Sequence, residues 1–300
     1  MRADVEFQSE GRSLRGWLYM PGDDASRTPC IVMAHGLSAV KEQHLARYAE
    51  VFASAGLGVL VYDHANFGAS DGWPRQEADP VLQRRGYRDA ISFAQTVPAI
   101  DPDRIGLWGT SYSGGHVLEV AANDRRVRCV VSQVPTISGY RSALRRTRAD
   151  LVPALLARFD ADRAARFRGE APTTFPAVSN DPDERCAMGG ADAYAFFTQT
   201  REFAPAWRNA LTLRSAEFAR ENEPGIHIAW ISPTPLLMIV ANHDMLTATD
   251  LCLEAYQQAL PPKQLLMIQG GHFDPYVRLF AQTSIAARDW FRAHLVDAGV

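Results

Sequence analysis

The amino-acid sequence predicts an α/β protein with a mostly parallel sheet, helices on both faces and an inserted helical cap. Unbroken apolar runs alternate with segments of helical periodicity along most of the chain, which is typical of parallel strands buried on both faces. This alternation stops between residues 134 and 231, which indicates an insertion. In addition, residues 105–108 form a short apolar run that passes through glycine and serine residues directly into a helical pattern.

The elements of this sheet follow one another in order. Residues 5–10 and 13–19 alternate between polar and apolar side chains around Gly11, which predicts an antiparallel hairpin. Buried strands are then expected at residues 30–34, 58–62, 105–108, 127–131, 235–240 and 264–268. Helices are expected at residues 41–55, 81–97, 249–260 and 277–295, with one more beginning at residue 112.

Residues 134–231 show no obvious buried strand, and we interpret them as a helical cap. They interrupt an α/β core formed by residues 1–133 and 232–300. Within the cap we expect an arginine-rich helix, a loop and an aromatic-rich helical stretch, at residues 141–168, 171–183 and 191–221. The arginines are expected to form a solvated face rather than an anion site. Most of the aromatic side chains are expected to pack within the cap, while a few line a substrate pocket.

Composition and charge argue against several classes of protein. Hydrophobic residues make up 47% and charged residues 22% of the 300 positions, as in ordinary globular chains. The net charge of -3 gives no reason to expect nucleic acid or an anionic membrane as a partner. No apolar run approaches the length of a membrane span, and the first twenty residues lack a signal-peptide core. We therefore expect a cytoplasmic protein.

The sequence gives no sign of a cofactor or metal. The four cysteines are not arranged as C-x-x-C and are expected to be free thiols. Four histidines are expected near one edge of the sheet, but their spacing matches no zinc motif; they are His35, His64, His243 and His272. Neither a P-loop nor a G-x-G-x-x-G fingerprint occurs.

The strand-to-helix turn carries the candidate nucleophile. Residues 109–113 read G-x-S-x-S, and Ser111 stands two residues after the glycine that ends the strand. A serine hydroxyl is a weak nucleophile, so it must be exposed, aimed and next to a base. At a helix N-terminus, backbone N–H groups also point toward developing negative charge. Ser113 is the alternative nucleophile, and we favour Ser111 because of its place at the turn.

A base and an acid are expected at the carboxyl ends of later strands. His272 follows the last strand within a Gly-Gly-His turn, which predicts that it is the general base. Asp244 follows the preceding strand and is predicted to hold His272 in the correct tautomer. Asp250 is the competing acid, but its place in the first turn of the next helix suits it to helix stabilisation.

An oxyanion hole would complete such a site. His35 and Gly36 follow the strand at residues 30–34, and Gly36 permits an unusual backbone turn. The backbone N–H groups of Leu37 and Tyr112 are the predicted donors. The loop has no further glycines, which argues against the glycine-rich oxyanion loops of some lipases.

Taken with these residues, the chain resembles the α/β-hydrolase superfamily over nearly its whole length. The segments that carry the resemblance are the N-terminal hairpin and residues 34–36, 41–42, 62–63, 67–72, 109–115 and 270–273. They are most similar to the branch near the X-Pro dipeptidyl peptidases and dienelactone hydrolases. The order Ser111, Asp244, His272 is the chain order of the catalytic triad in this superfamily. The resemblance implies an acyl-enzyme mechanism without a cofactor.

We therefore expect a serine hydrolase that cleaves an ester, thioester or lactone of a small-molecule acyl substrate. Acyl transfer or C–C bond hydrolysis by the same triad is the first alternative, and a non-catalytic small-molecule binding protein is the second. Superfamily membership does not identify the substrate. The oligomeric state is left open and includes a homo-oligomer.

Overall fold

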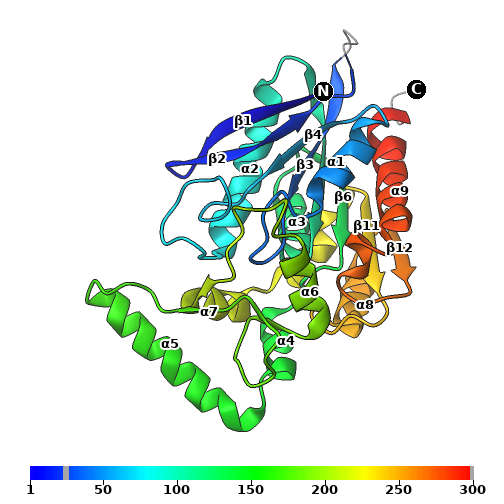
Figure 1. The fold of residues 1–300 in the computed structure, drawn as a ribbon. Helices are drawn as coiled ribbons and strands as arrows, with labels where there is room; N and C mark the ends of the chain where they lie inside the picture. The colour runs from blue at the N-terminus through cyan, green and yellow to red at the C-terminus, as the bar shows by residue number, and fades with distance from the viewer. Residues whose placement is uncertain (23–26, 298–300) are drawn as a thin grey trace.

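An eight-stranded sheet forms the centre of the molecule in the computed structural model, which describes residues 1–22 and 27–297 (Figure 1). Its strand order is β1-β2-β4-β3-β5-β6-β11-β12. β1 and β2 pair antiparallel, β2 pairs antiparallel with β4, and the remaining pairs are parallel. The strand bounds are Arg2–Ser9, Arg12–Tyr19, Thr28–Ala34, Gly58–Tyr62, Ile100–Thr110, Val127–Gln133, Leu236–Ala241 and Lys263–Ile268, for β1 to β6, β11 and β12.

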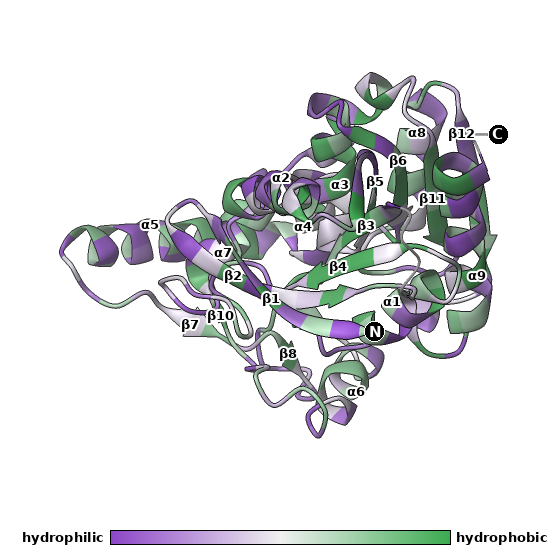
Figure 2. Cartoon of the chain, turned by 90° about the horizontal axis from the view of Figure 1, so that it is seen from above, coloured by the Kyte–Doolittle hydropathy of each residue, from purple (hydrophilic) through white to green (hydrophobic). Residues whose placement is uncertain are grey.

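Both faces of this sheet are buried, as the apolar runs predict. In β3, Ile31 and Met33 belong to one hydrophobic cluster, whereas Val32 and Ala34 belong to the other. Figure 2 shows the inner strands as hydrophobic, while β1 at the edge carries hydrophilic stretches. The first face is covered by α1 and α9, and the second by α2, α3 and α8. These helices span Leu45–Ala53, Phe280–Phe291, Pro80–Thr96, Tyr112–Asn123 and Thr249–Gln258.

The parallel α/β pattern is interrupted between β6 and β11 by a long inserted segment, residues 134–231. Figure 1 shows its helices gathered on one side of the α/β core, with α5 extending away from the sheet. The segment contains α4, α5, α6 and α7, at Gly139–Arg146, Val152–Phe167, Ala191–Gln199 and Leu213–Glu221. Two-residue strands and 3-10 turns connect them, at Ala149–Leu151, Thr174–Phe175, Val178–Ser179, Met188–Gly189, Leu211–Thr212 and Pro224–Ile231.

Several helices are shorter than their sequence patterns predict. The stretch 141–168 is divided because Thr147 is extended, with φ −112° and ψ 119°, and α5 begins only after this break. The stretch 191–221 is likewise divided into α6 and α7. Before α1, residues 41–44 are not helical, since the backbone N–H of Lys41 and its Nζ both donate to the carboxylate of Asp63.

Among residues 1–22 and 27–297, no helix has the length and apolar character needed to cross a membrane. Cys30, Cys129, Cys186 and Cys252 are all free thiols.

Candidate active site

Ser111 occupies a strained turn between β5 and α3. Its backbone has φ 56° and ψ −117°, a conformation that few residues other than glycine adopt. Gly109 makes the turn sterically feasible, because a Cβ there would lie 2.2 Å from the carbonyl oxygen of Ser113. The turn places the Ser111 side chain at the N-terminus of α3, where the helix dipole is positive.

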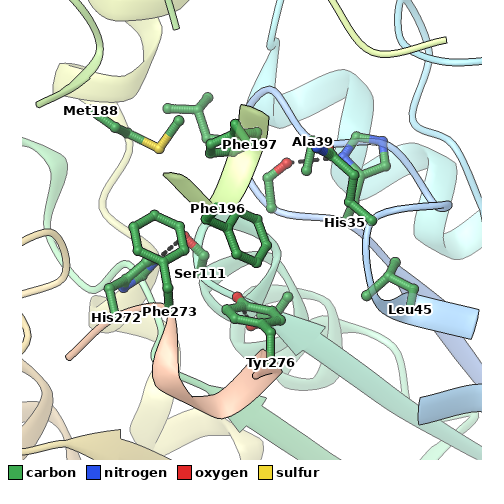
Figure 3. A pocket seen from close by; sticks show the side chains of 14 residues that line it. His35, Ala39, Leu45, Ser111, Met188, Phe196, Phe197, His272, Phe273 and Tyr276 are labelled. Carbon is green, nitrogen blue, oxygen red and sulfur yellow. Dashed lines mark hydrogen bonds between the residues drawn. The ribbon is translucent and has the colours of Figure 1, made fainter. Parts of the chain in front are cut away.

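A continuous chain of hydrogen bonds links Ser111 to His272 and Asp244. The Ser111 Oγ lies 2.9 Å from His272 Nε2 (Figure 3). His272 Nδ1 lies 2.7 Å from Asp244 Oδ2. The side chains of His272 and Asp244 are nearly inaccessible, with exposed fractions of 3% and 1%. The structure thus brings together the three residues that the sequence singles out, from the ends of β5, β11 and β12.

Asp244 is held by the loop that follows it. Leu246 and Thr247 donate their backbone N–H groups to Asp244 Oδ1 at 2.9 and 2.8 Å, and the Thr247 hydroxyl donates to Oδ2 at 2.9 Å. Burial works against ionisation of this carboxyl group, but the charge of His272 and the hydrogen bonds from His272 and Thr247 outweigh it and lower the pKa of Asp244. Thr247 was not identified from the sequence. The available signal is a threonine three residues after the proposed acid, Asp244.

The two alternative residues lie elsewhere. Asp250 is in the first turn of α8, where both of its oxygens accept hydrogen bonds from Arg145 at 2.6 Å. Ser113 is fully buried below the turn; its Oγ donates to the carbonyl of His35 at 2.6 Å and lies 2.8 Å from His64 Nε2. Neither residue takes part in the chain of hydrogen bonds from Ser111.

Gly36 lies directly against Ser111, and the next residue, Leu37, lines the same small cavity. A Cβ on Gly36 would come within 3.0 Å of the Ser111 Cβ. Among the described residues, no protein acceptor is found for the Leu37 backbone N–H, and Tyr112 is in the first turn of α3, where N–H groups have no partner within the helix. The N–H groups of Leu37 and Tyr112 therefore both lack a protein acceptor among the described residues.

His35 supports this loop from below, which the sequence did not indicate. Its Nδ1 lies 2.9 Å from the carbonyl of Gly36, and its Nε2 accepts the backbone N–H of His64 at 3.1 Å. Together these contacts require the tautomer protonated at Nδ1. Burial lowers the pKa of His35, against the opposing influence of Asp63, so the ring stays neutral.

The space beside Ser111 is small and apolar. The cavity measures about 20 Å³, and Phe196 and Phe197 from α6 face it together with Met188 (Figure 3). Trp207 stacks on the outer side of Phe197, with ring centroids 5.4 Å apart. In the part of the chain that the structure describes, no group of three histidine, cysteine or acidic side chains is arranged to hold a metal ion.

Comparison with known proteins places the chain among enzymes. Residues 10–274 match the model of the X-Pro dipeptidyl-peptidase (S15) family. The chain belongs to this family. It is 35% identical to the thiohydrolase aneE of Aspergillus aculeatus, over 88% of this chain and 83% of that protein. It is 30% identical to the polyketide transferase claH of Penicillium crustosum, over 90% of each.

The solved structures agree with this placement. This S15-family chain superimposes on the crystal structure of the α/β hydrolase GrgF from Penicillium sp. with a TM-score of 0.84 and 28% identity, over 98% of this chain and 99% of that one. Its fold is therefore the α/β-hydrolase fold, as the sequence predicts. The names of the relatives support a hydrolase or acyltransferase.

Proposed function

We propose that this S15-family protein is a serine hydrolase that cleaves an ester, thioester or lactone through an acyl-enzyme on Ser111. The observation that carries the proposal is the chain of hydrogen bonds from Asp244 through His272 to Ser111. A serine needs an adjacent base to become a nucleophile, and the base needs an orienting group. Ser111 and Asp244 each lie within hydrogen-bond distance of His272, at the carboxyl ends of the strands.

The proposed mechanism uses each group in turn. His272 Nε2 accepts the proton of Ser111 as its Oγ attacks the carbonyl carbon, and Asp244 stabilises the imidazolium that forms. The backbone N–H groups of Leu37 and Tyr112 donate to the oxyanion. His272 then protonates the departing alcohol or thiol, and activates a water that releases the acid from Ser111.

We propose in addition that residues 134–231 cap this site. Phe196 packs against Phe273 and Tyr276 of the core, with ring centroids 4.7 and 5.2 Å apart. Because Phe273 is adjacent to His272, this contact lays α6 over the catalytic residues and supports a role for the segment in shaping the substrate pocket.

The name of aneE, a thiohydrolase, favours a thioester among the three bond types. Acyl transfer is the second candidate, favoured by the name of claH, a polyketide transferase. Both reactions pass through the same acyl-enzyme and differ in whether water or another nucleophile accepts the acyl group. Product analysis with and without an added acceptor thiol or alcohol distinguishes them.

Covalent labelling tests the nucleophile directly. A fluorophosphonate is expected to modify Ser111, and mass spectrometry of the digested protein locates the adduct. Ser111→Ala should lose labelling and about 10⁶-fold in turnover, whereas Ser113→Ala should still be labelled. An adduct on Ser113, or full activity of Ser111→Ala, contradicts the proposal.

A further inference from the structure

A second and much larger cavity adjoins the small apolar one. It measures about 600 Å³ and lies under the inserted segment, and Leu37 lines both cavities. Met188 faces the small cavity, whereas its neighbours Ala187 and Gly189 line the large one. The cavity beside Ser111, at about 20 Å³, holds about one water molecule. Most of a substrate must therefore lie elsewhere, and the larger cavity has the volume of a typical ligand site.

The lining of the large cavity combines apolar walls with positive charge. Its apolar side chains come from α5 and the 3-10 turn before it, the short strands, α7 and the loop after Asp244. They include Leu151, Leu155, Phe175, Leu211, Leu213 and Leu246. Five arginines line it, namely Arg146, Arg148, Arg158, Arg185 and Arg220. Asp183 and Glu184 are the carboxylates among the lining residues, so the lining carries a net positive charge.

The arginines of this cavity differ from their neighbours on the same helices. On α4, Arg141 and Arg145 form ion pairs with Glu254 and Asp250 of α8, at 2.5 and 2.6 Å. Arg146, the next residue along α4, points to the cavity instead. Since the neighbouring arginines are paired, the lack of partners is specific to the side of the helix that faces the cavity.

Most of the cavity arginines have no carboxylate partner. Arg148 pairs with Asp150 at 2.8 Å, but within residues 1–22 and 27–297 no ion pair is found for Arg146, Arg158 or Arg185. Glu184 is engaged elsewhere, because it accepts a hydrogen bond from Ser179.

Arg220 supplies a second, independent observation. One of its guanidinium nitrogens, Nη1, is buried without a hydrogen-bond partner among the described residues, and its guanidinium lies 4.7 Å from the ring centroid of Tyr140. A buried donor without a partner costs free energy. Arg220 also borders a neighbouring hollow that contains Glu217 and Glu223, so Arg146 and Arg158 carry the greater part of the argument.

Unpaired guanidinium groups at a cavity are suited to an anion. A guanidinium binds a carboxylate or phosphate through two parallel hydrogen bonds. The side chains of Arg146, Arg158 and Arg185 are exposed, so a ligand in the cavity can reach their guanidinium groups. An anionic group of that ligand would be their carboxylate-like partner.

We propose that the large cavity binds a carboxylate or phosphate that is covalently part of the substrate, so that the enzyme acts on anionic esters or thioesters. The inference rests on the proposed function and adds the class of substrate. It also adds to the expectation that the arginines of the segment form a solvated face. Arg141 and Arg145 pair with carboxylates of α8, whereas Arg146 and Arg158 line the cavity. All four of these side chains are exposed, as expected. The anion belongs either to the acyl group or to the leaving group.

Two pairs of substrates distinguish these sources. Dicarboxylic acid mono-p-nitrophenyl esters place a carboxylate on the acyl side, and thioesters of mercaptoalkanoic acids place one on the leaving-group side. In each pair the control is the same compound with the carboxylate capped as a methyl ester. A series of chain lengths allows the anion to reach the arginines from Ser111. The wild-type enzyme should prefer the anionic member of one pair by about tenfold or more in kcat/KM.

Variants connect this preference to the arginines. Arg146→Gln and Arg158→Gln should each lower kcat/KM about tenfold for the anionic substrate, while turnover of the capped substrate and fluorophosphonate labelling stay within about twofold. Arg145→Gln is the matched control, because the Arg145 side chain pairs with Asp250 and does not line the cavity. This variant should leave the preference unchanged. Equal turnover of capped and anionic substrates at every chain length, or equal losses in the Arg145 and Arg146 variants, overturns the inference.

A binding measurement separates this inference from the proposed function. Calorimetry with Ser111→Ala and the same two series measures affinity without turnover. If Ser111 is not the nucleophile, tighter binding of the anionic compounds, weakened by Arg146→Gln, still supports the cavity assignment. If labelling of Ser111 succeeds but the anionic and capped compounds bind equally, the anion site is wrong while the hydrolase assignment stands.

Discussion

One edge of the sheet is formed by the carboxyl ends of β5, β11 and β12 around Ser111. This edge and the inserted segment above it are built in opposite ways. At the edge, His272, Asp244 and Ser113 are buried and hydrogen-bonded to specific partners. In the inserted segment, α5 has two buried residues, Phe159 and Asp162, over its full length. Several of the segment's arginines face a large cavity without a carboxylate partner.

This difference separates chemistry from selectivity. Proton transfer needs donor and acceptor atoms held at fixed positions, and a close-packed core supplies that rigidity. Selection of a substrate needs space and unpaired polar groups, which a core cannot hold without cost but a cavity can. Changes at the edge should therefore reduce turnover of every substrate, whereas changes in the segment should alter the preference between substrates.

The largest effect is expected from the acid at the edge. Asp244→Asn should lower kcat/KM about 10⁴-fold with the fold intact, because His272 is then no longer held in the reactive tautomer. Asp250→Asn removes an exposed ion pair with Arg145 and should have little effect, because such surface pairs contribute little to stability. The measurement is kcat/KM of both variants on one ester. A crippled Asp250 variant beside a nearly normal Asp244 variant contradicts the assignment of the acid.

A smaller loss of turnover is expected when the loop that contains Gly36 and Leu37 is displaced. A methyl group in Gly36→Ala would press on the Ser111 Cβ at 3.0 Å and on the Thr110 carbonyl at 3.3 Å. Displacing Ser111 or the Leu37 N–H by a fraction of an ångström should cost about 10²-fold in kcat. Gly189→Ala in the inserted segment is the comparison, since its Cβ would meet Cys186 Sγ at 3.9 Å. Similar kcat values for the two variants would show that the Gly36 contact is not critical.

In the inserted segment, the expected effect is on preference. Phe197→Ala enlarges the cavity beside Ser111 and should shift the ratio of kcat/KM for longer over shorter acyl chains by about tenfold. Phe203, which is 51% exposed, provides the control variant Phe203→Ala. Fluorophosphonate labelling should persist in both proteins. If Phe197→Ala instead lost activity equally on all chain lengths, Phe197 would support the reacting groups rather than select the acyl chain.

The smallest effect concerns stability rather than turnover. Burial lowers the pKa values of His35, His64 and His116, so these rings stay neutral in the folded protein. The unfolded chain binds their protons below about pH 6.5, so it holds more protons than the folded protein there. The free energy of unfolding should therefore fall as pH decreases below about 6.5, by up to about 1.4 kcal/mol per pH unit for each histidine.

Urea unfolding at neutral and mildly acidic pH measures this slope. His116→Gln provides the comparison, because it removes one of these groups and should reduce the slope by up to about 1.4 kcal/mol per pH unit. An unfolding free energy that does not change over this range would show that the buried histidines accept protons in the folded state.

The strands and the order of the candidate triad were predictable from the sequence because both depend on local patterns. A run such as residues 30–34 has no polar side chain, so it can only be stable inside a sheet covered on both sides. Parallel strands end at one edge, which brings residues that follow them close together. Ser111, Asp244 and His272 each follow such a strand, and the structure places His272 within hydrogen-bond distance of the other two.

The division of the arginines was decided by the tertiary structure. In the sequence, Arg145 and Arg146 are adjacent and equivalent, and a solvated face was the natural expectation for both. The packing of α4 beside α8 gives Arg145 a carboxylate partner, while Arg146 is turned toward the cavity. The same holds for Thr247 and His35, whose roles depend on contacts with residues distant in sequence or on loop conformation. Periodicity reports which side chains are buried, but the partner of a charged or polar group is set by which elements the fold brings together.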